Sequence, residues 1–372
     1  MTRRKILSIV GTRPEAIKMA PVIRELKARG EVFSSRVCAT AQHREMLDSV
    51  LKLFEIRPDH DLNLMRENQS LSQLTSAAIA GLDSVVRQEK PDWILVQGDT
   101  TTVLAAGLVG FYHQIRIGHV EAGLRSGQKY QPFPEEINRR VAGVVADAHF
   151  APTAEARQNL LREGVPESAV YVTGNTVIDA LQYIAAMPFN IAHSPLAGIP
   201  ARKRWVLVTA HRRENFGAPL ERICVALRQL AGRYAGSVQL IYPVHMNPNV
   251  EKPVRKMLGQ IENISLLPPL EYLPMVHLMK RSEIVLTDSG GLQEEAPGLG
   301  KPVLVFREVT ERPEGVRAGT VRLVGSDTGR IVEEASRLLD DRSAYEAMSK
   351  AIQPYGDGCA ARRIADILEE SS

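Results

Sequence analysis

Short apolar runs alternate with amphipathic stretches along the first half of the chain. Residues 6–10 form an apolar run interrupted only by Ser8, which predicts a buried strand, and further strands are predicted at 36–40, 93–97, 116–120 and 148–151. Continuous runs of this kind are typical of parallel strands that are covered on both faces. Between them, apolar positions repeat at helical spacing, as at Met19, Val22, Ile23 and Leu26. Alternating strands and helices predict a parallel sheet with right-handed crossovers.

A second series of the same kind follows a looser stretch, residues 187–200, which contains three prolines and has no clear period. Strands are predicted at 205–209, 238–242, 264–267, 284–286, 303–306 and 320–324, and a last amphipathic helix at 359–370. The sequence therefore predicts an α/β protein with two Rossmann-like doubly wound domains. We place the first domain at residues 1–173, the second at 174–357 and the terminal helix in 358–372.

Composition supports two ordinary globular domains, because 372 residues are about twice the usual domain size. The formal net charge is only +3, and Lys and Arg are interleaved with Asp and Glu, which argues against a nucleic-acid partner. Three widely separated cysteines suit the reducing cytoplasm. The apolar run 6–10 is too short for a signal peptide or a membrane span, so we predict neither, and no membrane partner.

Carboxylates follow the predicted strands of the first half. Asp99 and Glu121 come after the strands at 93–97 and 116–120, and Glu135 opens a helix after a Pro-Phe-Pro segment. Taken singly, Asp99 could be a helix cap, and Glu135 could be a first-turn acid favoured by the helix dipole. Because ligands of doubly wound sheets bind beyond the strand ends, three carboxylates on one rim predict acid/base chemistry near neutral pH.

The second half carries a candidate phosphate site. The strand at 284–286 runs into Ser289-Gly290-Gly291 and then a helix, which presents free backbone N–H groups to an anion. Glu295 lies further along that helix, where a carboxylate can accept two hydrogen bonds from a ribose diol. An ordinary glycine-rich turn is the simpler interpretation. Carboxylates in the first half and basic groups on both rims predict an interdomain cleft for a diphosphate.

Several blocks of the sequence together resemble the non-hydrolysing UDP-N-acetylglucosamine 2-epimerases of bacteria. These blocks are Gly11-Thr12-Arg13-Pro14-Glu15, Gln97-Gly98-Asp99-Thr100, His119-Val120-Glu121-Ala122-Gly123-Leu124-Arg125, Pro134-Glu135-Glu136, Gly174-Asn175-Thr176, His211-Arg212-Arg213-Glu214, Pro243-Val244-His245, Asp288-Ser289-Gly290-Gly291 and Thr310-Glu311-Arg312-Pro313-Glu314. The resemblance implies a glycosyltransferase-B-like domain pair, with the C-terminal helix packed back on the first domain. It also implies a homodimer that uses no metal, nicotinamide or other cofactor.

The resemblance further implies an activity. Family members interconvert UDP-N-acetylglucosamine and UDP-N-acetylmannosamine, the source of N-acetylmannosamine for cell-surface polysaccharide. UDP is eliminated to give 2-acetamidoglucal and then added back. By matching position, Asp99, Glu121 and Glu135 are the acid/base candidates, and His211 assists departure and return of UDP. Which carboxylate serves which face of the sugar stays open.

Binding residues are carried over in the same way. Those matching the substrate site are Arg13, Lys18, Ser289, Gly290, Gly291, Glu295 and Arg312. Those matching a site for a second UDP-N-acetylglucosamine, an allosteric activator, are Gln42, His43, Arg66, Arg212 and His245. Four alternatives remain: a glycosyltransferase of the same shape, a hydrolysing epimerase, an epimerase of a UDP-2,3-diacetamido uronic acid, and a non-catalytic nucleotide-sugar sensor.

Overall fold

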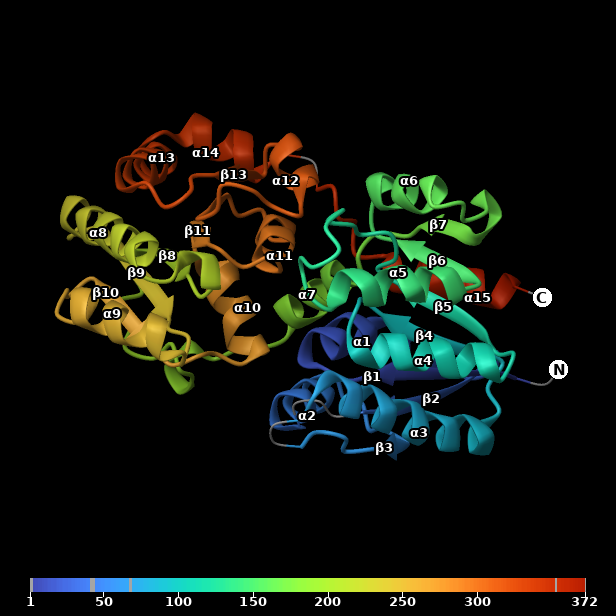
Figure 1. The fold of residues 1–372 in the computed structure, drawn as a ribbon. Coiled ribbons are helices and arrows are strands. Elements are labelled where there is room, and N and C mark those ends of the chain that lie inside the picture. Colours follow the sequence, from blue (N-terminus) through green and yellow to red (C-terminus); the bar gives the residue numbers. More distant parts are fainter. Residues whose placement is uncertain (1–2, 41–43, 67–68, 352, 372) are drawn as a thin grey trace. The chain divides into compact units, whose positions relative to one another are not determined.

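The computed structural model describes residues 3–40, 44–66, 69–351 and 353–371. The chain forms two compact units (Figure 1): an N-terminal unit that runs to Gln182 and resumes at Tyr355, and a C-terminal unit, Tyr183–Pro354. These limits differ by a few residues from the predicted boundaries, 173/174 and 357/358. The difference arises because Asp179 accepts hydrogen bonds from the first amides of the last helix, which ties residues beyond 173 to the N-terminal unit.

The N-terminal unit has a seven-stranded sheet in the order β3-β2-β1-β4-β5-β6-β7, and all of its pairs are parallel. The strands are β1 (Arg4–Val10), β2 (Phe33–Ala39), β3 (His60–Asp61), β4 (Trp93–Gln97), β5 (Arg116–Val120), β6 (Ala148–Ala151) and β7 (Val170–Val172). Every residue of β4 is buried, as its unbroken apolar run predicts.

Helices cover both faces of this sheet (Figure 1). They are α1 (Arg13–Ala28), α2 (Arg44–Leu53), α3 (Leu71–Glu89), α4 (Thr101–Tyr112), α5 (Glu135–Val145), α6 (Ala154–Arg162), α7 (Thr176–Ala186) and α15 (Ala360–Glu370). Helices α3, α4 and α5 lie side by side, and α15 packs against α1. Arg29 at the end of α1 fixes that packing through ion pairs with Asp366 and Glu369, at 2.7 and 3.0 Å.

The C-terminal unit repeats the design with a six-stranded parallel sheet in the order β10-β9-β8-β11-β12-β13. Its strands are β8 (Arg204–Thr209), β9 (Val238–Pro243), β10 (Ile264–Leu267), β11 (Ile284–Thr287), β12 (Val303–Val305) and β13 (Val321–Leu323). Its helices are α8 (Ala218–Arg233), α9 (Pro248–Leu258), α10 (Tyr272–Arg281), α11 (Leu292–Gly298), α12 (Pro313–Arg317), α13 (Thr328–Asp340) and α14 (Arg342–Ser349).

The strand order of each sheet reverses once, between β1 and β4 in the N-terminal unit and between β8 and β11 in the C-terminal unit. Ligands of doubly wound folds bind beyond the strand ends at such a switch point. The predicted fold class, two Rossmann-like domains, is therefore confirmed. Among the described residues, no helix combines the length and the apolar character needed to cross a membrane.

Candidate active site

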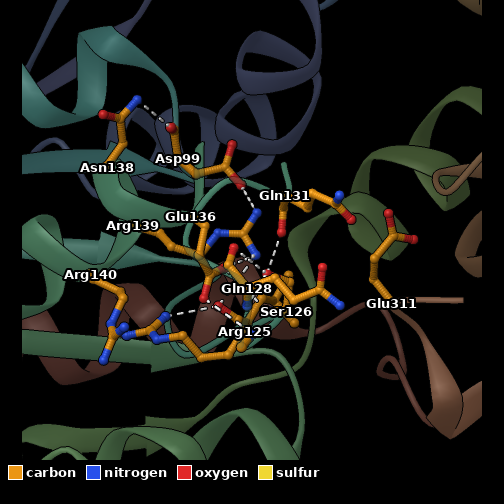
Figure 2. Close-up of polar contacts among 12 residues, drawn as sticks. Asp99, Arg125, Ser126, Gln128, Gln131, Glu136, Asn138, Arg139, Arg140 and Glu311 are labelled. Atoms are coloured by element: carbon orange, nitrogen blue, oxygen red, sulfur yellow. Dashed lines mark hydrogen bonds and ion pairs between the residues drawn. The ribbon is translucent and has the colours of Figure 1, made fainter. Parts of the chain in front are cut away.

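Asp99 lies at the switch point of the N-terminal unit, in the turn between β4 and α4. Gly98 before it has a positive φ of 81°, and Thr100 after it caps α4. Two residues of α5 hold Asp99: Arg139 forms an ion pair with its carboxylate, and the Asn138 amide donates to its backbone oxygen at 3.0 Å (Figure 2). The Asp99 side chain is still 29% exposed, so it remains accessible to a ligand.

Glu121 follows the neighbouring strand, β5, and is almost buried. Its φ of 63° lies in the left-handed region, which is unfavourable for a residue with a side chain and is found most often at functional sites. The Glu121 carboxylate accepts hydrogen bonds from the Lys18 ammonium and the Gln97 amide. Lys18, which was predicted at the substrate site, pairs with this carboxylate in the structure.

The first two residues of α5 differ sharply, although both are glutamates. Glu136 is 1% exposed and accepts hydrogen bonds from the backbone N–H groups of Ser126 and Gly127, at 3.1 and 3.3 Å. Glu135 is half-buried, and no contact to its carboxylate is found among the described residues. Glu136 thus anchors the loop before the helix, whereas Glu135 does not take part in this anchor.

Two buried groups that the sequence did not single out support the Asp99 turn. Glu15 is 2% exposed and accepts hydrogen bonds from the Thr100 hydroxyl and from the amides of Gly11 and Thr12 at 2.6 Å. Burial raises the pKa of Glu15 to about 7. The His119 Nε2 atom lies 2.7 Å from the Gly98 carbonyl oxygen, and burial lowers the pKa of this imidazole to about 3. A capping-box spacing, Thr12 to Glu15, was the signal available for Glu15.

The predicted diphosphate turn, Ser289-Gly290-Gly291, lies at the switch point of the C-terminal unit and leads into α11. Gly290 has no room for a side chain, because a Cβ there would lie 2.7 Å from Nη1 of Arg312 and 3.3 Å from Nη2 of Arg212. Two guanidinium groups therefore flank the turn. Arg312 is held there by an ion pair with Glu294, which is buried.

His211 follows β8 beside the same turn. Its side chain is 34% exposed, and its ring stacks on that of His245 with 5.6 Å between the centroids. Burial lowers the pKa of His211, and the Asp288 carboxylate, 3.5 Å from its Nδ1 atom, opposes this shift. Glu295 is half-buried on α11, one residue beyond Glu294.

The predicted activator residues are only partly described. Gln42 and His43 lie outside the described residues. Arg66 is exposed in the N-terminal unit. In the C-terminal unit, the Arg212 guanidinium lies beside Gly290, and the His245 ring stacks on that of His211. Arg13 is half-buried at the start of α1.

Fold and site together define a class. One unit carries acid/base candidates at its switch point, and the other carries a glycine turn flanked by guanidinium groups, as in enzymes that act on nucleotide-linked substrates. A family model described as UDP-N-acetylglucosamine 2-epimerase matches residues 24–369. The chain therefore belongs to the UDP-N-acetylglucosamine 2-epimerase family.

Individual relatives agree along the whole chain. The UDP-N-acetylglucosamine 2-epimerase of Escherichia coli K12 is 54% identical and is covered, like this chain, over 99% of its length. The crystal structure of UDP-GlcNAc 2-epimerase from Neisseria meningitidis bound to UDP-GlcNAc shares 48% identity, with a TM-score of 0.89 over 99% of this chain and 100% of that one. The Methanocaldococcus jannaschii enzyme in complex with UDP-GlcNAc and UDP shares 32%, with a TM-score of 0.80 over the same fractions. A glycosyltransferase of kitacinnamycin shares the fold at 12% identity, with a TM-score of 0.65 over 99% of both chains.

Proposed function

We propose that the protein interconverts UDP-N-acetylglucosamine and UDP-N-acetylmannosamine by eliminating UDP to form 2-acetamidoglucal and adding it back. We also propose that the product supplies N-acetylmannosamine units to cell-surface polysaccharide. The observation that carries the proposal is the pair of carboxylates, Asp99 and Glu121, on neighbouring strand ends of one unit. A non-catalytic sensor needs no such pair.

Proton transfer is assigned to the N-terminal unit. The hydrogen on sugar C2 is barely acidic, so its removal needs a carboxylate held close to it while the leaving group departs. Asp99 and Glu121 are held by Arg139 and Lys18, which keeps each carboxylate in one place. Glu135, half-buried and uncommitted among the described residues, is the third acid/base candidate.

Departure of UDP is assigned to the C-terminal unit. Negative charge develops on the diphosphate as the C1–O bond breaks, and fixed donors that meet this charge stabilise the transition state. Arg212 and Arg312 beside Gly290 supply positive charge, and His211 is available to donate a proton to the departing oxygen. Glu295 is proposed to bind the ribose diol.

The experiment that tests the proposal is proton NMR of UDP-N-acetylglucosamine with the protein in D2O. Epimerisation by proton exchange predicts UDP-N-acetylmannosamine with deuterium at C2. Release of free N-acetylmannosamine would instead identify a hydrolysing enzyme. If the spectrum stays unchanged, the experiment is repeated with the UDP-2,3-diacetamido uronic acid. Epimerisation of that compound alone would identify it as the substrate.

Allosteric activation by UDP-N-acetylglucosamine is part of the proposal. Arg212 and His245 support it, because the Arg212 guanidinium lies beside the diphosphate turn and the His245 ring stacks on His211. If UDP-N-acetylglucosamine activates the enzyme, the reaction started from pure UDP-N-acetylmannosamine should show a lag that a trace of UDP-N-acetylglucosamine abolishes. A linear start without added activator would contradict this regulation.

We further propose a cytoplasmic homodimer. Its interface is proposed on α3, α4 and α5, where a groove of about 860 Å³ is lined partly by apolar side chains and Phe111, Tyr112 and Val144 are exposed. Light scattering should give twice the monomer mass for the wild type and a lower mass for Val144→Asp. Val172→Asp, at an exposed valine of β7, is the matched control. The three free cysteines are compatible with a reducing compartment.

A further inference from the structure

Asp288, the first residue after β11, is a buried carboxylate whose role is not covered by the chemistry above. It is 0% exposed. Burying a carboxylate is costly unless hydrogen-bond donors replace its water. Asp288 receives these donors from the loop after β8: the His211 N–H at 2.8 and 3.1 Å from the two oxygens, the Arg212 N–H at 2.8 Å and the Asn215 amide at 2.9 Å.

These donors lie across the switch point. Strands β8 and β11 are neighbours, and Thr209 and Thr287 at their ends share a hydrogen bond of 2.6 Å. Asp288 adds the next link, from the end of β11 to the loop that follows β8. A carboxylate needed only to close this loop could have bonded any of its amides. It bonds the consecutive amides of His211 and Arg212, the two residues of this loop assigned to the leaving group.

The other neighbour of Asp288 in the chain is the diphosphate turn itself. Ser289 begins that turn, and its N–H donates to the Thr287 hydroxyl at 2.9 Å. The Arg212 guanidinium lies within van der Waals reach of a side chain at Gly290. Asp288 thus links the Ser289–Gly291 turn to the backbone of His211 and Arg212.

We propose that Asp288 is a positioning residue that holds His211 and Arg212 over the Ser289-Gly291 turn, so that the departing UDP oxygen meets them without rearrangement. The inference rests on the proposed function for the role of His211. Preorganised groups that do not move during the reaction are the ones that lower a barrier most effectively. A carboxylate behind an imidazole also selects the tautomer of the ring and stabilises its protonated form.

The charged and titratable groups that face His211, within the described part of the chain, come from three loops. They are Asp288 after β11, Arg212 in its own loop and His245 after β9. Asp288 raises the pKa of His211, whereas Arg212 and His245 lower it in addition to burial. Removing the Asp288 carboxylate therefore leaves only groups that oppose protonation.

The mutational test is Asp288→Asn, which keeps the shape and one acceptor oxygen. We expect kcat to fall about 10- to 100-fold, the size expected for a small misplacement of reacting groups. KM should change less than kcat, and the alkaline limb of the kcat profile, where the proton donor is lost, should move to lower pH. Asn215→Ala is the matched control, because it removes one donor to the carboxylate and leaves both backbone contacts. Equal losses in the two variants, or a wild-type kcat and pH profile in folded Asp288→Asn, would overturn the proposal.

A second measurement needs no variant of Asp288 and does not depend on turnover. Nitrogen-15 NMR of the histidine-labelled wild type, with the His211 signals identified by their loss in His211→Asn, reports the tautomer of the ring. We expect the proton on Nδ1, the atom that faces Asp288. A proton on Nε2 alone would remove Asp288 as the group that orients the ring. If the wild type fails to epimerise its substrate while the Nδ1 tautomer is found, the proposed function fails and the positioning of His211 stands.

Discussion

The switch points of the two sheets are built alike and carry opposite chemistry. In the N-terminal unit, buried Glu15 joins the loop after β1 to Thr100 after β4. In the C-terminal unit, buried Asp288 joins the loop after β11 to that after β8. Above these links, the first unit presents the carboxylates of Asp99 and Glu121, whereas the second presents guanidinium groups and a glycine turn.

This difference shows how one fold supports two tasks. In each unit the buried carboxylate, Glu15 or Asp288, holds two loops together, and other residues at the strand ends carry the charge that differs between the units. In the first unit the framework holds acid/base candidates, and cations from α1 and α5 hold those in turn. In the second unit it holds donors for an anion. Predictions that separate proton transfer from anion binding therefore test the comparison directly.

The largest effect is expected from Asp99→Asn and Glu121→Gln. Each change removes a proposed acid/base group, so kcat should fall by about 10²- to 10⁴-fold. UDP binding should persist, because the anion-binding groups lie in the other unit. Rate assays and calorimetry with UDP measure the two quantities. Glu31→Gln, at an exposed carboxylate, is the control. Near-normal kcat in either active-site variant would remove that residue from the mechanism.

A second prediction contrasts one cation from each unit, Lys18→Met and Arg312→Met. Lys18→Met leaves nearly buried Glu121 without its ammonium, which should lower the unfolding free energy by about 3 kcal/mol and reduce kcat. Arg312→Met should weaken UDP binding by roughly 1.5–3 kcal/mol, because a charged hydrogen-bond donor is lost. Calorimetry, denaturant titration and rate assays distinguish them. If Lys18→Met weakened UDP binding as much as Arg312→Met did, the division of tasks would be wrong.

Much of the fold could be predicted from the sequence, because strands covered on both faces must be apolar throughout. The runs at 93–97 and 284–286, for example, coincide with β4 and with most of β11. Strand β3 was missed, since two residues, His60 and Asp61, carry no periodic signal. The predicted end of the first domain, residue 173, lies nine residues before Gln182, the end of the N-terminal unit, because Asp179 accepts hydrogen bonds from a helix far away in the sequence.

The sequence predicted where the site residues lie, but not which side chains contact them. Strand-end residues such as Asp99 and Glu121 were identified because a parallel sheet brings its carboxyl ends to one edge. Their partners were not, because the Lys18 contact with Glu121 joins helix α1 to the segment after β5, 103 residues away. The sequence likewise does not show which of Glu135 and Glu136 is buried, because this depends on the orientation of the first turn of α5. The buried roles of Asp288 and Glu15 were not predicted, since the sequence does not reveal burial of an isolated acid and the capping-box spacing of Glu15 indicates only the start of a helix.

A third prediction concerns pH and the framework of the first unit. Burial lowers the pKa of His119 from its ordinary 6.5 to about 3. The unfolded chain therefore binds the proton first, so this histidine contributes its full stability above pH 6.5 and loses it as the pH falls toward 3. Between pH 7 and pH 5 the loss is about 2 kcal/mol.

The measurement is denaturant unfolding of the wild type and of His119→Gln at both pH values. Glutamine can still donate to the Gly98 carbonyl oxygen, and all other titrating groups, including Glu15 and His149, cancel in the comparison. The variant should lose about 2 kcal/mol less than the wild type on acidification. Parallel losses in both proteins would show that His119 already carries a proton in the folded state.

The smallest effect contrasts two glycines, Gly98 and Gly290, one at each switch point. Gly98 needs its backbone conformation: φ is 81°, and no atom lies within 4 Å of a Cβ built there. Gly290 needs space, because the Arg312 guanidinium occupies the place of its side chain. Gly98→Ala should therefore cost about 1 kcal/mol of stability through strain and leave UDP binding unchanged. Gly290→Ala should leave stability nearly unchanged and weaken UDP binding by about 1 kcal/mol, or fivefold, by displacing a guanidinium. Thermal unfolding measures the stability of both variants, and calorimetry measures their affinity for UDP. A loss of UDP affinity in Gly98→Ala rather than in Gly290→Ala would contradict the assignment of the anion to the C-terminal unit.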